Sequence, residues 1–207
     1  MFAGLSGRGC LFLVAGASGV GKDAIIDGAR HRLAAERGVV FPLRTIARPD
    51  GFGGEIHVAV TPAQFDRLRR RGAFALYWGA RGLNYAIPAS IDQDIARGCV
   101  VVVNAPLCVL PEARARYGEV VVVWVSAEAA LRRQRLVARG REPLAEIEAQ
   151  MRFSDDLPPD DEVEVIVNED RLDSAVGALV GLVMDRLDSQ RPAKRQDGPG
   201  LTVPGPL

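Results

Sequence analysis

The feature that most constrains the fold is an apolar run followed by a glycine-rich loop that ends in Gly-Lys. Residues 10–15 (CLFLVA) have the composition of a buried strand, residues 16–23 (GASGVGKD) form the loop, and a helical pattern begins after Lys22. In this context the spacing is typical of a phosphate-binding loop. Its glycines let backbone N–H groups converge on an anion, and the helix N-terminus adds partial positive charge. The loop therefore predicts a nucleoside triphosphate as ligand.

Two positions of this loop, Lys22 and Asp23, have individual expected roles. The ammonium group of Lys22 should lie near the β- and γ-phosphates of ATP. Asp23 stands where Ser or Thr normally meets Mg²⁺, and a carboxylate can serve that metal directly or through water. The predicted nucleotide-binding residues are Gly16, Ala17, Ser18, Gly19, Val20, Gly21, Lys22 and Asp23.

Strand-like and helix-like segments alternate along the rest of the chain. Residues 99–103 and 120–125 are continuous apolar runs, as expected of parallel strands that are buried on both faces. A helix over residues 22–36 and a strand over residues 41–47 are expected after the loop. The pattern predicts an α/β fold with three layers, in which helices cover both faces of a parallel sheet.

The segments group into one domain, residues 10–187, with two insertions. The arrangement suggests a small kinase with a lobe for the acceptor and a lid over the phosphates. The predicted parts are a flexible N-terminus (1–9), a sheet core (10–40 and 98–187), an acceptor lobe (41–90), a helical lid (about 127–154) and a disordered tail (188–207).

Composition argues against several classes of partner. The chain carries 26 basic and 26 acidic residues, so no excess charge favours nucleic acid or an anionic membrane surface. No apolar run reaches membrane-spanning length, and the first residues lack the layout of a signal peptide. Cys10, Cys99 and Cys108 lie in or beside apolar runs without metal-ligand spacing. They predict buried, reduced thiols and a cytoplasmic protein.

Several further stretches carry a resemblance to a known family. They are the phosphate loop with Asp23 after its lysine, and the segments 54–57 (GEIH), 76–78 (LYW), 104, 110–117 (LPEARARY), 133–136 (RQRL), 139–142 (RGRE) and 167–168 (VN). With these stretches, residues 10–187 resemble the guanylate-kinase-like P-loop kinases, and within that group the ribose 1,5-bisphosphate phosphokinases.

The resemblance implies a reaction. The γ-phosphoryl group of ATP would pass to the 1-phosphate of ribose 1,5-bisphosphate and give phosphoribosyl diphosphate, with Mg²⁺ as cofactor. Such a step belongs to phosphonate catabolism or to an alternative route to phosphoribosyl diphosphate. In the lid, Arg135 and Arg139 share a helix face and Arg141 follows. The family pattern favours a clamp on the phosphates over a solvated surface for these arginines.

The acceptor site departs from the guanylate kinase pattern. Guanylate kinases hold the acceptor phosphate with two arginines, and here only Arg48 fits; Asn104 stands where they read guanine with a carboxylate. A pocket without base-reading groups discriminates poorly between bases, which makes GMP a poor candidate. A structural role for His57 and core packing for the two tyrosines remain alternatives. The substrate-binding residues that the resemblance implies are Arg48, Glu55, His57, Tyr77, Tyr85 and Asn104.

Two other functions compete with this one. The first is a nucleoside monophosphate kinase with altered base specificity. The second is a non-catalytic guanylate-kinase-like interaction module. Such modules tend to lose the loop lysine and the lid arginines, whereas both are present here. The expected partner is a small-molecule substrate, and a homodimer is among the assemblies that the sequence allows.

Overall fold

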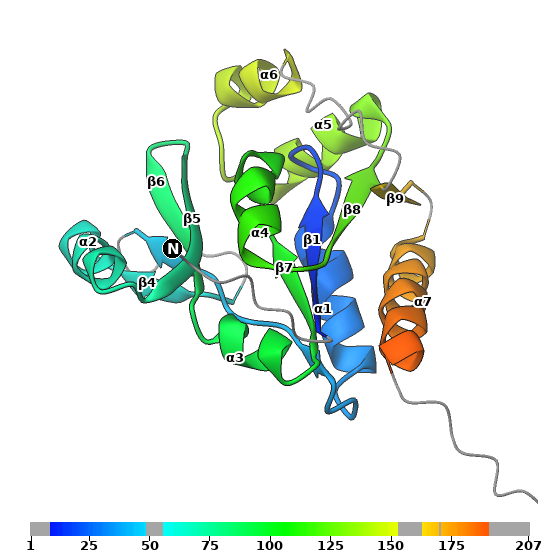
Figure 1. Ribbon diagram of the computed structural model, residues 1–207. Helices are drawn as coiled ribbons and strands as arrows, with labels where there is room; N and C mark the ends of the chain where they lie inside the picture. Colours follow the sequence, from blue (N-terminus) through cyan, green and yellow to red (C-terminus); the bar gives the residue numbers. More distant parts are fainter. Residues whose placement is uncertain (1–8, 49–55, 153–162, 170, 191–207) are drawn as a thin grey trace, which may run out of the picture.

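A five-stranded parallel sheet forms the centre of the fold, with the strand order β2-β7-β1-β8-β9 (Figure 1). The computed structural model describes residues 9–48, 56–152, 163–169 and 171–190. The five strands are β1 (Cys10–Ala15), β2 (Val39–Val40), β7 (Val100–Asn104), β8 (Val120–Ser126) and β9 (Val163–Val167). All neighbouring strands run parallel, as the apolar runs predicted.

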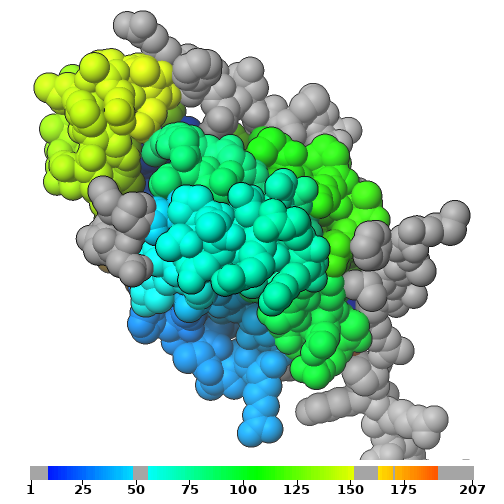
Figure 2. Space-filling view, turned by 90° about the vertical axis from the view of Figure 1, so that its left-hand side faces the viewer, coloured from blue at the N-terminus to red at the C-terminus, as the bar shows by residue number. Residues whose placement is uncertain are grey.

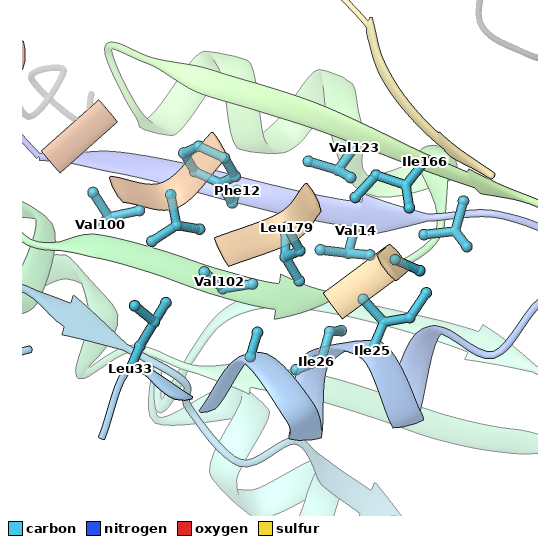
Figure 3. Close-up of a cluster of buried hydrophobic side chains, with 14 of the residues drawn as sticks. Phe12, Val14, Ile25, Ile26, Leu33, Val100, Val102, Val123, Ile166 and Leu179 are labelled. Carbon is cyan, nitrogen blue, oxygen red and sulfur yellow. The ribbon is translucent and has the colours of Figure 1, made fainter. Parts of the chain in front are cut away.

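Helices cover both faces of this sheet. On one face, α1 (Lys22–Arg32) and α7 (Leu172–Gln190) pack on β1, β7, β8 and β9; Figure 3 shows Ile25 of α1 and Leu179 of α7 close to Val14 of β1. Each of these side chains is completely buried, and such burial stabilises the fold by about 1.5–3 kcal/mol per side chain. The opposite face is covered by α3 (Ile91–Ala96) and α4 (Leu110–Arg116). The expected three-layer α/β/α fold is confirmed.

The first insertion, which the sequence predicts to be the acceptor lobe and which keeps that name below, has a sheet of its own. Its four strands have the order β4-β3-β6-β5, and α2 (Pro62–Arg70) packs against one face through Phe65. The helix begins at a capping box in which Thr61 and Gln64 bond each other's backbone N–H, as the sequence indicates. The strands are β3 (Thr45–Ala47), β4 (Val58–Val60), β5 (Phe74–Ala80) and β6 (Leu83–Pro88).

The second insertion, which the sequence predicts to be the lid and which keeps that name below, is a pair of helices above the sheet, α5 (Ala129–Arg139) and α6 (Leu144–Arg152) (Figure 1). The space-filling view of Figure 2 faces the acceptor lobe and shows the lid helices beside it. Helix α5 ends at Gly140, whose φ of 64° is the left-handed conformation common after helices.

Several element boundaries differ from the sequence-based expectation. Helix α1 ends at Arg32 and not near residue 36, because two turns then lead the chain back to the sheet. Of the strand expected over residues 41–47, only Thr45–Ala47 pairs; Pro42 in its first half has no N–H to donate. The short edge strand β2 was missed. Helix α7 continues to Gln190, three residues into the segment assigned to the tail.

The three cysteines form no disulfide. Cys10 is buried and Cys99 is half-buried, whereas Cys108 is exposed, which corrects the expectation that all three thiols are buried. Desolvation by the surrounding protein atoms, which for Cys108 is only partial, raises the pKa of each thiol above its ordinary value, so all three favour the protonated form. Among the described residues, no helix combines the length and apolarity needed to cross a bilayer.

A polar cluster links α3 to α4 at the edge of the core. Asp92 accepts hydrogen bonds from Arg116 (Nε, 3.0 Å) and from the hydroxyl of Tyr117 (2.7 Å). Burial opposes ionisation of Asp92, but these two donors outweigh it, so the pKa of Asp92 lies below its ordinary value. Burial, and then the bond to Asp92, raise the pKa of Tyr117. The cluster therefore connects the two helices through charge-assisted hydrogen bonds.

Replacing Asp92 with Asn is expected to lower the free energy of unfolding at pH 7 by about 2 kcal/mol, because two charge-assisted hydrogen bonds are weakened. Since the pKa is lowered in the folded state, the contribution is complete above the unfolded-state pKa of about 4 and is lost as the pH falls through the folded value. Urea unfolding between pH 2.5 and 7 measures this. Asp185→Asn, at an exposed position of α7, is the control. A stability difference that stayed constant across this range would contradict the assignment.

Candidate active site

The phosphate loop connects β1 to α1 at the carboxyl end of the sheet. Gly16 and Gly21 have φ angles of 139° and 94°, which L side chains rarely adopt. A Cβ atom on Gly16 would lie 2.2 Å from the carbonyl oxygen of Val125, and one on Gly21 would lie 2.5 Å from Nδ2 of Asn168. Strand β8 at Gly16, and the Asn168 side chain after β9 at Gly21, thus add to the backbone angles in favouring glycine at both positions.

The ammonium group of Lys22 lies inside this loop. Its Nζ atom donates to the carbonyl oxygens of Gly16 (2.6 Å) and Ala17 (3.0 Å). Its position in the first turn of α1 puts the charge beside the positive end of the helix. A full positive charge and a helix N-terminus, together with the backbone N–H groups of a glycine-rich loop, make this end of the sheet suited to a polyphosphate.

The carboxylate of Asp23 connects the loop to the rest of the site. It accepts a hydrogen bond from Nδ2 of Asn104, at the end of β7, and pairs with Arg44 of the acceptor lobe at 3.5 Å. Arg44 also donates to the backbone carbonyl of Asn104 (3.2 Å) and lies 5.7 Å from the ring centre of Tyr85. Asp23, Tyr85 and Asn104, which the sequence proposed separately, therefore lie together around an arginine that it did not propose.

A second pair of site candidates lies within the acceptor lobe. The guanidinium of Arg48 faces the ring of His57, with nitrogen–nitrogen distances of 3.0 Å to each ring nitrogen. A neutral imidazole accepts at one nitrogen only, so only one of these two contacts at a time is a hydrogen bond from Arg48. Glu55 lies outside the described residues.

The lid arginines have different surroundings. Arg135 of α5 donates to the backbone carbonyls of Asn168 (2.9 Å) and Val20 (3.4 Å), which fastens the lid to the phosphate loop and to the end of β9. Arg139 pairs with Glu142 at 2.5 Å. Arg141 is exposed and follows the helix end. Only Arg135 of the three candidates thus reaches the loop directly.

Two residues that the sequence did not indicate join the lobes. Arg81, at the turn between β5 and β6, donates to Oγ of Ser18 in the loop and lies 3.5 Å from the Glu142 carboxylate of the lid. Arg132 of α5 donates from Nε to the carbonyl oxygen of Ser18 (3.0 Å). The hairpin, the lid and the phosphate loop therefore meet at Ser18. In each of these contacts the two residues lie more than 60 positions apart in sequence, so no local motif predicts them.

One candidate does not join this group. Tyr77 pairs with Ala86 in the hairpin register, on the face that α2 covers, and its ring lies under the guanidinium of Arg69. Tyr85 belongs to the opposite face and stacks on Trp78 at 5.7 Å between ring centres. Tyr77 is 44% exposed, so core packing does not describe its position, and contact of its hydroxyl with the acceptor stays a prediction.

The donor set around the loop suits a metal that arrives with its nucleotide. Among the described residues, no group of three or more His, Cys, Asp or Glu side chains could hold a metal ion. Mg²⁺ in kinases is held by one or two carboxylates, water and the substrate phosphates, so a protein cage is not needed. Asp23, half exposed beside Lys22, provides one carboxylate of that kind.

Comparison with known proteins identifies relatives over nearly the full length. No protein-family model matches the chain. It is 41% identical over 185 residues to the ribose 1,5-bisphosphate phosphokinase PhnN of Thiobacillus denitrificans, covering 89% of this chain and 97% of the relative. The protein of that name from Pseudofrankia inefficax is 43% identical over 179 residues, covering 86% and 93%.

A solved structure supports the fold. The chain superposes on guanylate kinase from Anaplasma phagocytophilum with a TM-score of 0.57 at 16% identity, over 93% of this chain and 90% of that one. The two chains thus share the guanylate-kinase-like fold, as the sequence resemblance implied. Because it is 41–43% identical to the phosphokinases over most of its length, this chain belongs to the ribose 1,5-bisphosphate phosphokinase family.

Proposed function

We propose that this protein transfers the γ-phosphoryl group of ATP to the 1-phosphate of ribose 1,5-bisphosphate. The products are ADP and phosphoribosyl diphosphate. The observation that carries the proposal is the 41–43% identity, over 86–89% of this chain, to phosphokinases named for this substrate, together with a phosphate loop that keeps its lysine. The proposal extends to Mg²⁺ as cofactor; a cytoplasmic location and a homodimer stay predictions.

The chemistry needs little from the protein beyond positioning and charge. An ionised oxygen of the 1-phosphate is already a nucleophile; it forms a bond to the γ-phosphorus while the bond to the β-phosphate oxygen breaks. No general base is required. Lys22 would offset the charge of the transferring group, and Mg²⁺, carried with ATP and held in part by Asp23, would neutralise the phosphates further. From the lid, the guanidinium groups of Arg135, Arg139 and Arg141 would bind the phosphates and offset further negative charge.

The surroundings of Asn104 disfavour the competing guanylate kinase reaction. In this chain the Asn104 side-chain amide donates a hydrogen bond of 2.5 Å to the carboxylate of Asp23, at the end of the phosphate loop. An amide in that position offers no carboxylate to accept hydrogen bonds from a guanine ring. The retained loop lysine and lid contacts also disfavour a non-catalytic interaction module.

Steady-state kinetics with a panel of acceptors tests the proposed function. Purified protein with Mg²⁺ and ATP should release ADP with ribose 1,5-bisphosphate at a kcat/KM at least about 100 times that with GMP, AMP, CMP or UMP, because site groups built for one substrate discriminate by such factors. Turnover of GMP with none of the sugar bisphosphate would support the nucleotide kinase alternative. Absence of turnover with every acceptor would support the interaction module.

A further inference from the structure

Arg44 lies at the junction of the acceptor lobe and the phosphate loop. Its side chain is only 16% exposed, and its guanidinium contacts three elements: Asp23 of α1, the carbonyl of Asn104 after β7, and the ring of Tyr85 in β6. These contacts hold a permanent positive charge beside the residue that follows Lys22 in sequence. Arg44 therefore lies beside the loop to which the proposed function assigns the phosphates of ATP.

A second arginine of the same lobe has a separate position. Arg44 precedes the first residue of β3, and Arg48 follows the last one. Arg48 contacts His57 within the lobe, whereas Arg44 reaches out of the lobe to Asp23. The residues on either side of this short strand are thus two cations with different partners among the described residues: Arg44 contacts Asp23 beside the phosphate loop, and Arg48 contacts His57.

Two separate cations suit an acceptor with two separate phosphates. A nucleoside monophosphate carries one phosphate, whereas ribose 1,5-bisphosphate carries one on each of two carbons. Guanidinium groups bind phosphate through a planar fork of two N–H donors, which a point charge cannot reproduce. We propose that Arg44 determines acceptor specificity by binding the reacting 1-phosphate, while Arg48 with His57 binds the 5-phosphate; this assignment rests on the proposed function.

The weak pairing of Arg44 with Asp23 fits this role. Their separation of 3.5 Å exceeds the 2.7–3.2 Å of a good N–H···O bond, and Asp23 already accepts a bond from Asn104. A phosphate carries more charge than a carboxylate and can take over this donor, while the bond from Arg44 to the Asn104 carbonyl keeps the guanidinium in place. The arginine would then offset the repulsion between the acceptor phosphate and the γ-phosphate.

Isothermal titration calorimetry without ATP separates the two phosphate sites. The ligands are ribose 1,5-bisphosphate and ribose 5-phosphate, which lacks the 1-phosphate. Arg44→Gln should weaken bisphosphate binding about tenfold or more and change ribose 5-phosphate binding less than about threefold. Arg48→Gln should weaken both ligands. Arg69→Gln removes an arginine from the α2 face of the same lobe and should change neither.

Other outcomes decide against the assignment. If Arg44→Gln weakens both ligands equally, Arg44 is only a tether between lobe and loop; if it weakens neither, Arg44 binds no phosphate. Arg44→Lys keeps the charge without the fork and should also lose preference for the bisphosphate, so it serves as the test if Arg44→Gln does not fold. Wild-type protein that binds GMP but neither sugar phosphate overturns the proposed function itself. If Arg44→Lys keeps the wild-type preference for ribose 1,5-bisphosphate over ribose 5-phosphate, only the role of Arg44 is overturned.

Discussion

Replacing Lys22 with Ala is expected to lower kcat by about 100- to 1,000-fold while the protein remains folded. The ammonium group acts on charge that moves onto the bridging and leaving oxygens in the transition state, and loss of one such group costs a factor of this size. Two of its hydrogen bonds go to carbonyls of the loop, which water can satisfy in the variant, so the expected loss of stability is only about 1 kcal/mol.

Kinetics with saturating ATP and thermal unfolding by circular dichroism measure the two parts of this prediction. Lys22→Met keeps most of the side-chain length without the charge and should match Lys22→Ala in kcat. If Lys22→Met retained activity within a few-fold of wild type, the assignment of the loop as the site of phosphoryl transfer would be wrong.

Replacing Gly16 with Ala is expected to lower the free energy of unfolding by about 3 kcal/mol or more. Two costs add at this position: a φ of 139°, which strains any residue with a Cβ, and a contact of 2.2 Å between that Cβ and the carbonyl oxygen of Val125. The carbonyl belongs to the interior strand β8, which cannot move without disturbing its pairing with β1 and β9.

Gly98 provides the matched control for this variant. Its φ is also positive, at 87°, but a Cβ there would meet nothing within 4 Å. Gly98→Ala should therefore cost only the backbone strain, about 1–2 kcal/mol. Urea unfolding of both variants measures the difference. Equal losses would show that the contact with Val125 does not determine the need for glycine.

The parts of the fold that the sequence predicts are those encoded locally. The strand, loop and helix around Lys22 follow from adjacent residues, and the valine runs of β7 and β8 identify strands buried on both faces. The capping box at Thr61 likewise marks the start of α2. In contrast, β2 has two residues and pairs only because β7 lies beside it, so no periodicity identifies it.

The candidate site could be predicted only in part, because only part of it is encoded in adjacent residues. Its phosphate loop is one continuous motif, whereas Arg44 and Arg81 find their partners 21 and 63 residues away. In a chain whose basic residues are almost all arginine, the residue type alone does not distinguish these two from surface arginines. The family pattern suggested Tyr77, but the hairpin register places it on the face opposite Tyr85.

The central claim is that the acceptor is a sugar bisphosphate and not a nucleotide. A competition followed by ³¹P NMR tests it most directly, with ribose 1,5-bisphosphate and GMP at equal concentration and ATP limiting. The account predicts that the resonance of the 1-phosphate is replaced by the coupled pair of a 1-diphosphate, with ADP as the nucleotide product and GMP unchanged. Formation of GDP while the sugar bisphosphate remains intact would contradict it.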